Sequence, residues 1–348
     1  MEKKVGKIGE IDIIAFTLKN NHGMEVTLLN YGGRITSIKV PDRAGVFEEI
    51  VIGYSDIENY FTDEVYFGAI CGRVAGRIRS GKFSLGQREF RLTQNDGNNH
   101  LHGGKDNFSH AIWQAKPLID RKNPMLCMSY TSKDGEEGYP AELVVDVVYE
   151  LTEDNRLIIT YYAKSSNDTV VNLTNHTYFN LSGGHEDTIL SHQLQIDSEV
   201  FLEIDEQALP TGNLLQTKGT PFYLCEGGTI GEKINKSHEQ LEIANQGYNH
   251  AFVLKGSAQP QITLIDSQSG RQMRVQTDAP CAVVYTASYF DESLVLGEKR
   301  AGKYVGICLE TQGFPDAINH GHFPSIILRK NEYYQTKTTY QFSVVKGE

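Results

Sequence analysis

Two side chains in this sequence have the type and surroundings needed to move protons, His176 and Glu310. His176 lies in the run NLTNHTYFNL, residues 172–181, between asparagines whose amides could hold its ring in one tautomer. Glu310 follows the apolar residues 307–309 and precedes a loop with Gly and Pro, where partial burial would raise the pKa of its carboxyl group. Taken alone, His176 could be a structural histidine and Glu310 a residue at the rim of a sheet. Together they could act as an acid and a base in a reaction without net redox change.

Two arginines, Arg73 and Arg77, stand four residues apart among small residues in GRVAGRI, residues 72–78. They are either surface charges or a guanidinium fork, whose planar donors suit hydroxyl or anionic groups. The pattern by itself leaves both interpretations open.

His100 and His102 occur in NHLHGG, residues 99–104, and on a strand they would share a face. That spacing is compatible with a metal site, which needs a further carboxylate or histidine nearby in the fold. No glutamate follows within thirty residues, and the HGH at 320–322 has the character of a loop. We therefore expect no metal and no cofactor. Gly103 and Gly104 indicate a sharp turn or a close approach to the backbone.

Other catalytic patterns are missing from the sequence. It has one prominent carboxylate rather than the pair that glycoside hydrolysis uses. It has no G-x-S-x-G nucleophile elbow and no glycine loop that cradles phosphate.

The composition is typical of a globular protein that handles small molecules. The chain has 348 residues, 39% of them hydrophobic, and can bury a large core. A net charge of −11 without a basic cluster argues against nucleic acid or an anionic membrane as partner. The five cysteines contain no CxxC pair, which indicates a reducing compartment. Because no signal peptide and no apolar run of ~20 residues is visible, we expect a cytoplasmic protein. We expect a monomer or a homodimer, and the sequence does not decide between them.

The elements that must position these side chains are almost all β-strands. Apolar residues alternate with polar ones in TKTTYQFSVV near the C-terminus, and residues 141–163 are typical of a hairpin with a short polar turn. Only residues 237–246 favour a helical turn or two. We predict an all-β protein, one large antiparallel β-sandwich domain over residues 1–348 with few short helices. Further strand-like runs lie at 24–30, 34–40, 83–92, 251–255, 261–265 and 282–288.

Taken together, these motifs resemble those of the aldose 1-epimerases (galactose mutarotases). The resemblance begins at NYGGRITSIKVPDR, residues 30–43, and continues through GRVAGRI, NHLHGG, DGEEGYP, NLTNHTYFNL, GYNHAF and VVYTAS to LETQGFPDAINH. It covers nearly the whole chain in order, so the combination is specific although each motif is only moderately so. It implies a supersandwich of antiparallel strands with an open cleft, and an isomerase without metal or cofactor that acts on free aldohexoses such as galactose and glucose.

The resemblance also implies roles for individual residues. Glu310 would be the general base that takes the proton from the C1 hydroxyl, and His176 the general acid that protonates the ring oxygen. The opened sugar could then reclose as the other anomer. His102 would hydrogen-bond near the ring oxygen or a hydroxyl, while Arg77 and Asn249 would bind hydroxyls. With the pKa of His176 near its usual ~6.5 and that of Glu310 raised, we expect a bell-shaped pH profile.

The sequence departs from the family pattern at three positions. Asn249 stands where the GYDH motif has an aspartate, which removes a charge-assisted hydrogen bond. Gly76 and Val283 stand where some members have asparagine and glutamine. The preferred hexose therefore stays open.

Two other functions compete with a mutarotase. A sugar-phosphate epimerase would need a convergent basic cluster, for which only Arg77 and Arg73 are candidates. A non-catalytic sugar-binding module should have lost Glu310 or His176, and the sequence keeps both in full motif context.

Overall fold

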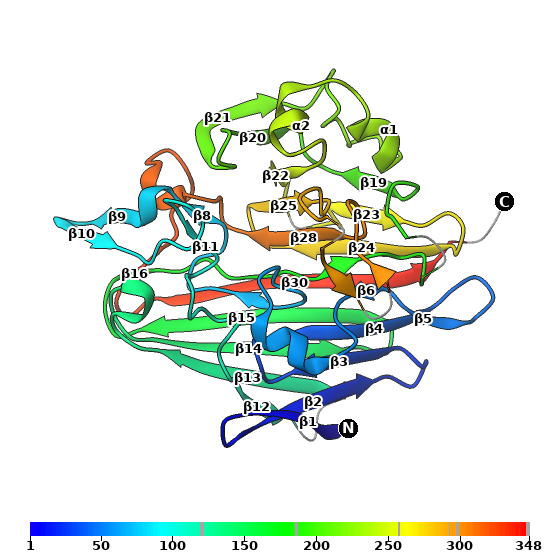
Figure 1. Ribbon diagram of the computed structural model, residues 1–348, viewed down its shortest axis with the longest axis horizontal. Coiled ribbons are helices and arrows are strands. Elements are labelled where there is room, and N and C mark those ends of the chain that lie inside the picture. The colour runs from blue at the N-terminus through cyan, green and yellow to red at the C-terminus, as the bar shows by residue number, and fades with distance from the viewer. Residues whose placement is uncertain (119–121, 185–186, 257, 292, 297–298, 346–348) are drawn as a thin grey trace.

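Antiparallel β-strands make up most of the molecule (Figure 1). The computed structural model describes residues 1–118, 122–184, 187–256, 258–291, 293–296 and 299–345. The predicted all-β class with few short helices is confirmed, because the helical elements are short and the strands assemble into large antiparallel sheets.

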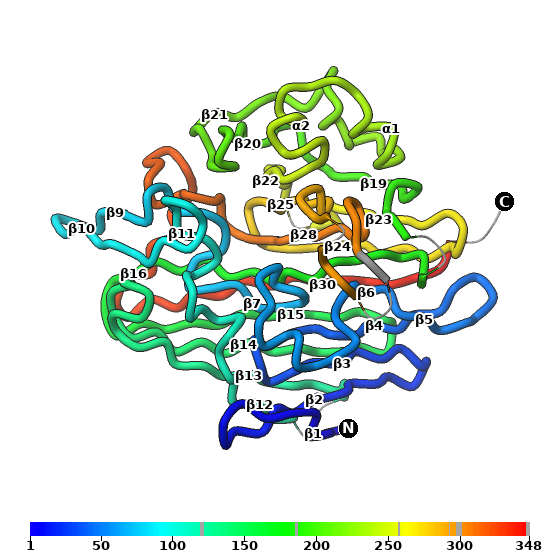
Figure 2. Tube along the Cα trace, viewed as in Figure 1, coloured from blue at the N-terminus to red at the C-terminus, as the bar shows by residue number. Residues whose placement is uncertain are grey.

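The largest sheet has eight strands in the order β12-β13-β14-β15-β30-β24-β23-β19. The predicted hairpin is confirmed as β14 and β15, and buried residues alternate with more exposed ones along both strands. Figure 2 shows the last strand in the sequence, β30, running between β15 and β24. The bounds are β12 Gln114–Pro117, β13 Met125–Ser132, β14 Leu143–Leu151, β15 Arg156–Ser165, β19 Gln193–Ile196, β23 Ile262–Ile265, β24 Arg271–Thr277 and β30 Tyr333–Val344.

A second sheet has seven strands in the order β21-β20-β22-β25-β28-β18-β6. All residues of β25 and β28 are buried, as expected for strands in the middle of a sheet that is covered on both faces. The bounds are β6 Val51–Ile52, β18 Tyr178–Phe179, β20 Val200–Ile204, β21 Pro210–Gln216, β22 Asn249–Val253, β25 Cys281–Tyr285 and β28 Ile307–Gln312.

The N-terminal strands form a third sheet of five strands in sequence order, β1 Glu2–Ile8, β2 Ile11–Lys19, β3 Glu25–Leu29, β4 Ile35–Pro41 and β5 Phe47–Glu49. Five small pairs complete the strands: β7 Ile70–Cys71 with β17 Thr174–Asn175, β8 Arg77–Ile78 with β11 His100–Leu101, β9 Lys82–Leu85 with β10 Arg88–Arg91, β16 Thr169–Val170 with β29 Ile327–Leu328, and β26 Val295–Leu296 with β27 Lys299–Arg300. The helical turns are η1 Ile57–Thr62, η2 Arg79–Gly81, η3 Glu136–Gly138, α1 Ile230–Ile234, α2 Glu239–Ile243 and η4 Ala317–Asn319.

The main hydrophobic core lies between the inner faces of the three large sheets. It combines buried residues such as Val26 of β3, Val145 of β14 and Val284 of β25. Apolar side chains of three different sheets therefore stabilise one another, which is how a sandwich removes its apolar faces from water.

Most of the expected strands lie where the sequence placed them. Runs 24–30, 34–40, 251–255, 261–265 and 282–288 correspond to β3, β4, β22, β23 and β25. Run 83–92 is two strands, β9 and β10, because Gly86 turns the chain between them. The helical expectation at 237–246 is confirmed by α2, and in the described residues no helix has the length and apolar character to span a membrane.

Candidate active site

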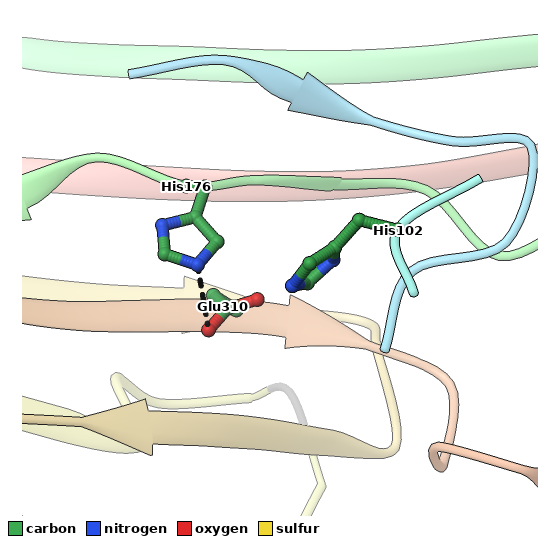
Figure 3. A group of neighbouring side chains, drawn as sticks. All are labelled: His102, His176 and Glu310. Carbon is green, nitrogen blue, oxygen red and sulfur yellow. Dashed lines mark ion pairs between the residues drawn. The ribbon is translucent and has the colours of Figure 1, made fainter. Parts of the chain in front are cut away.

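A cleft of about 690 Å³ opens beside β22, β25 and β28 of the seven-stranded sheet. Its lining includes His102, His176 and Glu310, which come from three distant parts of the sequence. A cleft of this size that gathers ionisable side chains is the preferred place for ligand binding. Figure 3 shows the three side chains converging from separate segments.

The backbone on both sides of His176 is fixed in place. The residue lies between β17 and β18, its N–H donates to the Ala69 carbonyl oxygen (2.8 Å), and its own carbonyl oxygen accepts from the Gly68 N–H (3.0 Å). The side chain of Asn175 donates to the Gly68 carbonyl oxygen (2.8 Å). The asparagine thus holds the backbone rather than the imidazole, contrary to the sequence-based expectation. The ring is nevertheless held, because its Nδ1 lies 3.4 Å from the Cys308 thiol.

Glu310 lies on β28, opposite Val283 of β25, and is almost completely buried. One of its carboxylate oxygens is 3.6 Å from Nε2 of His176 (Figure 3). Within the described residues the carboxylate accepts no hydrogen bond, and Glu310 belongs to the wall of the cleft. Burial raises the pKa of Glu310 to about 8, and the nearby positive charge of Arg77 only partly opposes this.

Burial also lowers the pKa of His176 to about 4. The expectation of an ordinary histidine pKa is therefore wrong, since an imidazolium without water costs more than a neutral ring. Between these two pKa values the pair carries one proton. It can then donate a proton at one atom and accept a proton at the other, as acid–base catalysis in both directions requires.

His102 is held in a single tautomer by the backbone of Gly76. The Gly76 N–H donates to His102 Nδ1 (3.2 Å), and the His102 N–H donates to the Gly76 carbonyl oxygen (3.0 Å). Because Nδ1 is an acceptor, the ring proton is on Nε2, and His102 presents an N–H donor to the cleft. Burial and the neighbouring His176 lower the pKa of His102 well below its usual value, so the ring stays neutral.

The glycine at 103 fits the expectation of a close backbone approach. Its φ of +97° is in a region that glycine adopts freely, and a Cβ there would lie 1.8 Å from the Gly72 carbonyl oxygen. The approach is to another part of the chain, the GRVAGRI segment. It sets the distance between that segment and His102.

The trio of His102, His176 and Glu310 could in principle hold a cation, since one donor atom of each lies within 4.8 Å of the others. The tautomer of His102 opposes this. A metal would need the lone pair of Nε2, which carries the proton as long as Gly76 donates to Nδ1. The residues therefore fit hydrogen bonding to a neutral ligand better than metal ligation.

His100 does not share a face with His102. Its Nδ1 lies 2.6 Å from the Thr93 carbonyl oxygen and its Nε2 lies 2.6 Å from the Tyr139 hydroxyl, both away from the cleft. The prediction of a shared face is wrong because β11 ends at Leu101 and His102 has a left-handed φ of 48°.

The two arginines of GRVAGRI also separate. Arg73 is buried and donates to the carbonyl oxygens of Pro140 and Ala141 (2.8 Å each). It is therefore neither a surface charge nor part of a fork, which overturns both interpretations for this residue. Arg77 lines the cleft and pairs with Asp96 at 2.7 Å, a partner that the sequence did not indicate.

The three positions at which the sequence departs from the family pattern, Asn249, Gly76 and Val283, all line the cleft. In the sheet, Asn249 lies opposite Tyr285, and Val283 lies between Ala251 and Glu310. Val283 thus places an apolar side chain on the strand next to Glu310.

Sequence reasoning missed the tyrosines that surround the pair. Tyr178 and Tyr66 have ring centroids 5.0 Å and 5.8 Å from that of His176, and Tyr285 lies 6.4 Å away. Tyr178 could have been found, because it stands two residues after His176 in a strand-like run. Nothing in the sequence around Tyr66 indicates its position.

The chain is similar to known proteins over nearly its whole length. The family model described as aldose 1-epimerase matches residues 15–341. Galactose mutarotase of Bos taurus is 38% identical, with 97% of this chain and 96% of the relative covered. Aldose 1-epimerase of Escherichia coli (strain K12) is 33% identical, with 94% of each covered. The crystal structure of galactose 1-epimerase from Lactobacillus acidophilus NCFM superposes with a TM-score of 0.89 at 29% identity, covering 99% of this chain and 98% of that one. The match of the family model across most of the chain, with relatives above 30% identity, shows that this chain belongs to the aldose 1-epimerase family.

Proposed function

We propose that the protein interconverts the α and β anomers of free aldohexoses such as galactose and glucose, with Glu310 and His176 as the proton-transfer pair. The observation that carries this proposal is their 3.6 Å contact inside a cleft, between two buried side chains that together hold one proton. The names of the relatives, galactose mutarotase and aldose 1-epimerase, support the same reaction.

The reaction needs two proton transfers at oxygens bonded to the same carbon, the C1 hydroxyl and the ring oxygen. Glu310 takes the hydroxyl proton, and His176 gives its proton to the ring oxygen as the C1–ring oxygen bond breaks. The aldehyde then rotates about the C1–C2 bond, and the reverse transfers close the ring on the other face and restore both groups. Two groups only 3.6 Å apart match two oxygens on one carbon.

This direction of transfer starts from the form with Glu310 ionised and His176 protonated, which burial disfavours. Sugar hydroxyls that donate to the carboxylate stabilise its charged form, so a bound sugar shifts the proton toward His176. The high pKa of Glu310 makes it a stronger base than an ordinary carboxylate once it is ionised.

Three further side chains bind the sugar in this proposal. His102 donates its Nε2–H to the ring oxygen or an adjacent hydroxyl. Arg77, oriented by Asp96, donates to hydroxyls, and Asn249 contributes an amide that both donates and accepts. Each lines the same cleft as the pair.

The charges of the cleft disfavour a phosphorylated sugar. Among the described residues that line it, Arg77 is the only arginine or lysine, and Asp96 already neutralises that charge. Glu64 and Glu206 add negative charge to the same lining. A phosphate would therefore be repelled rather than bound.

The test is polarimetry of freshly dissolved α-galactose and α-glucose, each with and without the protein. We expect the optical rotation to reach its equilibrium value much faster with protein, and α-glucose 6-phosphate to respond less. If the protein binds either hexose but does not accelerate mutarotation, the chain is a sugar-binding module and the proposal fails.

Three further expectations stay proposals. The chain forms one domain over residues 1–348, it acts in the cytoplasm, and it is a monomer or homodimer. The absence of a CxxC pair among the five cysteines supports the second of these. Size-exclusion chromatography with light scattering tests the third.

A further inference from the structure

Tyr66 has a backbone conformation that tyrosine rarely adopts. Its φ is 61°, in the left-handed region that is costly for a residue with a bulky side chain. Such a conformation persists only where the surroundings enforce it, and it occurs preferentially at functional sites.

The loop that carries Tyr66 is fixed on both sides. Asp63 accepts from the backbone N–H groups of Val65 (3.1 Å) and Phe67 (3.0 Å). Arg34, fully buried and paired with Asp63, donates to the Phe67 carbonyl oxygen (2.9 Å). These bonds enforce the turn in which Tyr66 is the residue with positive φ.

The same loop is attached to the segment that bears His176. The Tyr178 hydroxyl donates to the Val65 carbonyl oxygen (3.0 Å), and the Gly68 N–H donates to the His176 carbonyl oxygen (3.0 Å). A shift of Tyr66 and a shift of His176 are therefore mechanically linked.

The Tyr66 ring contacts both histidines of the cleft. Its centroid lies 4.8 Å from that of His102 and 5.8 Å from that of His176, while the two imidazoles are nearly perpendicular, at 83°. Aromatic rings at such distances attract one another and exclude water. The Tyr66 ring thus limits how far either imidazole can rotate.

The Tyr66 hydroxyl is free to meet a ligand. Tyr66 lines the cleft, and in the described parts of the chain its hydroxyl has no hydrogen-bond partner. Burial raises its pKa above the ordinary value, so the hydroxyl stays neutral and able to donate. An unpaired hydroxyl at the wall of a polar cleft gains most by bonding to a ligand oxygen.

Building on the proposed function, we propose that Tyr66 is both a positioning residue for His102 and His176 and a direct hydrogen-bond partner of a sugar hydroxyl. The ring keeps the two imidazoles crossed and shields them from water. The hydroxyl contacts the substrate next to the oxygens that exchange protons.

Two variants separate the roles. Tyr66→Phe removes the hydroxyl and keeps the ring, so we expect KM for galactose to rise ~2- to 12-fold with kcat nearly unchanged. Tyr66→Asn removes the ring and suits a left-handed residue, so we expect kcat to fall about 10- to 100-fold. Tyr162→Phe, on the exposed outer face of β15, is the matched control and should change neither constant.

The role of the Tyr66 ring can also be tested by a measurement that needs no catalytic turnover. Its result therefore does not depend on the proposed reaction. In NMR titrations of the sugar-free protein, Tyr66→Asn should raise the pKa of His176 from about 4 toward its usual value, because water reaches the ring. Besides Tyr66, the groups in contact with His176 are Glu310, Cys308, His102, Tyr178 and Tyr285. The charges of Asp63 and Arg34 also act on its titration.

The outcomes are distinct. If Tyr66→Phe leaves KM unchanged, or galactose affinity unchanged by calorimetry, the hydroxyl does not contact the sugar. If folded Tyr66→Asn keeps kcat and the His176 titration of the wild type, the ring does not position the imidazoles. A wild type without mutarotase activity would overturn the proposed function, while the calorimetric and NMR results would still decide the role of Tyr66.

Discussion

In the described part of the chain, two ionisable pairs have both side chains buried, and the fold satisfies one pair far more fully than the other. Arg34 and Asp63 are both fully buried and form an ion pair. Asp63 also accepts two backbone N–H groups, and Arg34 donates to the carbonyl oxygens of Phe67 (2.9 Å) and Ser109 (3.0 Å). A buried charge with this many partners stabilises a local structure, here the loop around Tyr66.

His176 and Glu310 are almost as deeply buried but have few partners. Apart from their 3.6 Å contact, the described residues offer the Glu310 carboxylate no hydrogen bond, and both side chains face the cleft. Burial without partners is what raises the pKa of Glu310 and lowers that of His176. The difference teaches that a buried ionisable group serves structure where the fold supplies most of its hydrogen bonds. It is available to a substrate where the fold leaves them open.

The largest effect should come from Glu310→Gln, which keeps the shape of the Glu310 side chain and removes the proposed base. We expect kcat to fall about 10²- to 10⁴-fold while the melting temperature stays near that of the wild type or rises. Polarimetry and thermal melting measure the two quantities. His176→Ala should cause a comparable loss of rate, and near-normal rates in either variant would contradict the assigned roles.

The next largest effect should be on stability, and it should come from breaking the buried Arg34–Asp63 pair. Asp63→Ala leaves the Arg34 guanidinium buried without its partner, so we expect the free energy of unfolding to fall by about 3–5 kcal/mol. Urea unfolding of Asp63→Ala and of Glu310→Gln, each compared with the wild type, measures the loss of unfolding free energy. A loss no larger than that of Glu310→Gln would remove the distinction between the pairs.

The smallest effect is a difference in how stability depends on pH. The folded pKa of Glu310 is about 8, above its ordinary value of 4.5, so this carboxyl favours the folded state at low pH. That contribution is lost as pH rises from about 4.5 to about 8, because the unfolded chain ionises first. Glu310→Gln does not titrate and should gain stability relative to the wild type over this window, by on the order of 1 kcal/mol or more at pH 9. Melting temperatures at pH 5, 7 and 9 test this, and a constant difference between the proteins would contradict it.

The sequence alone predicted the strands well, and it singled out His176 and Glu310, which the structure places 3.6 Å apart in one cleft. Period-two patterns located β14, β15 and β30, because half-buried strands must alternate. His176 and Glu310 stood out because polar residues inside apolar β-runs need a reason to be buried.

What the sequence could not predict depends on packing between distant segments. Arg73 and Arg77 stand in one short motif, yet only the fold determines that Arg73 donates to carbonyl oxygens of residues 140 and 141 and that Arg77 faces the cleft. His100 and His102 separated because a left-handed residue ended their strand, which local propensity does not specify for histidine. The sequence did not indicate Tyr66 either, because local propensity does not specify a left-handed backbone conformation for a tyrosine.

The place of β30 has a consequence for how the protein is made. This strand comes last in the sequence but lies in the interior of the eight-stranded sheet, between β15 and β24. During synthesis the two halves of that sheet cannot join until residues 333–344 have left the ribosome, and until then both edges expose unpaired backbone groups. The eight-stranded sheet therefore cannot be completed until β30 has been synthesised, and the exposed edges of β15 and β24 are possible sites of aggregation before then.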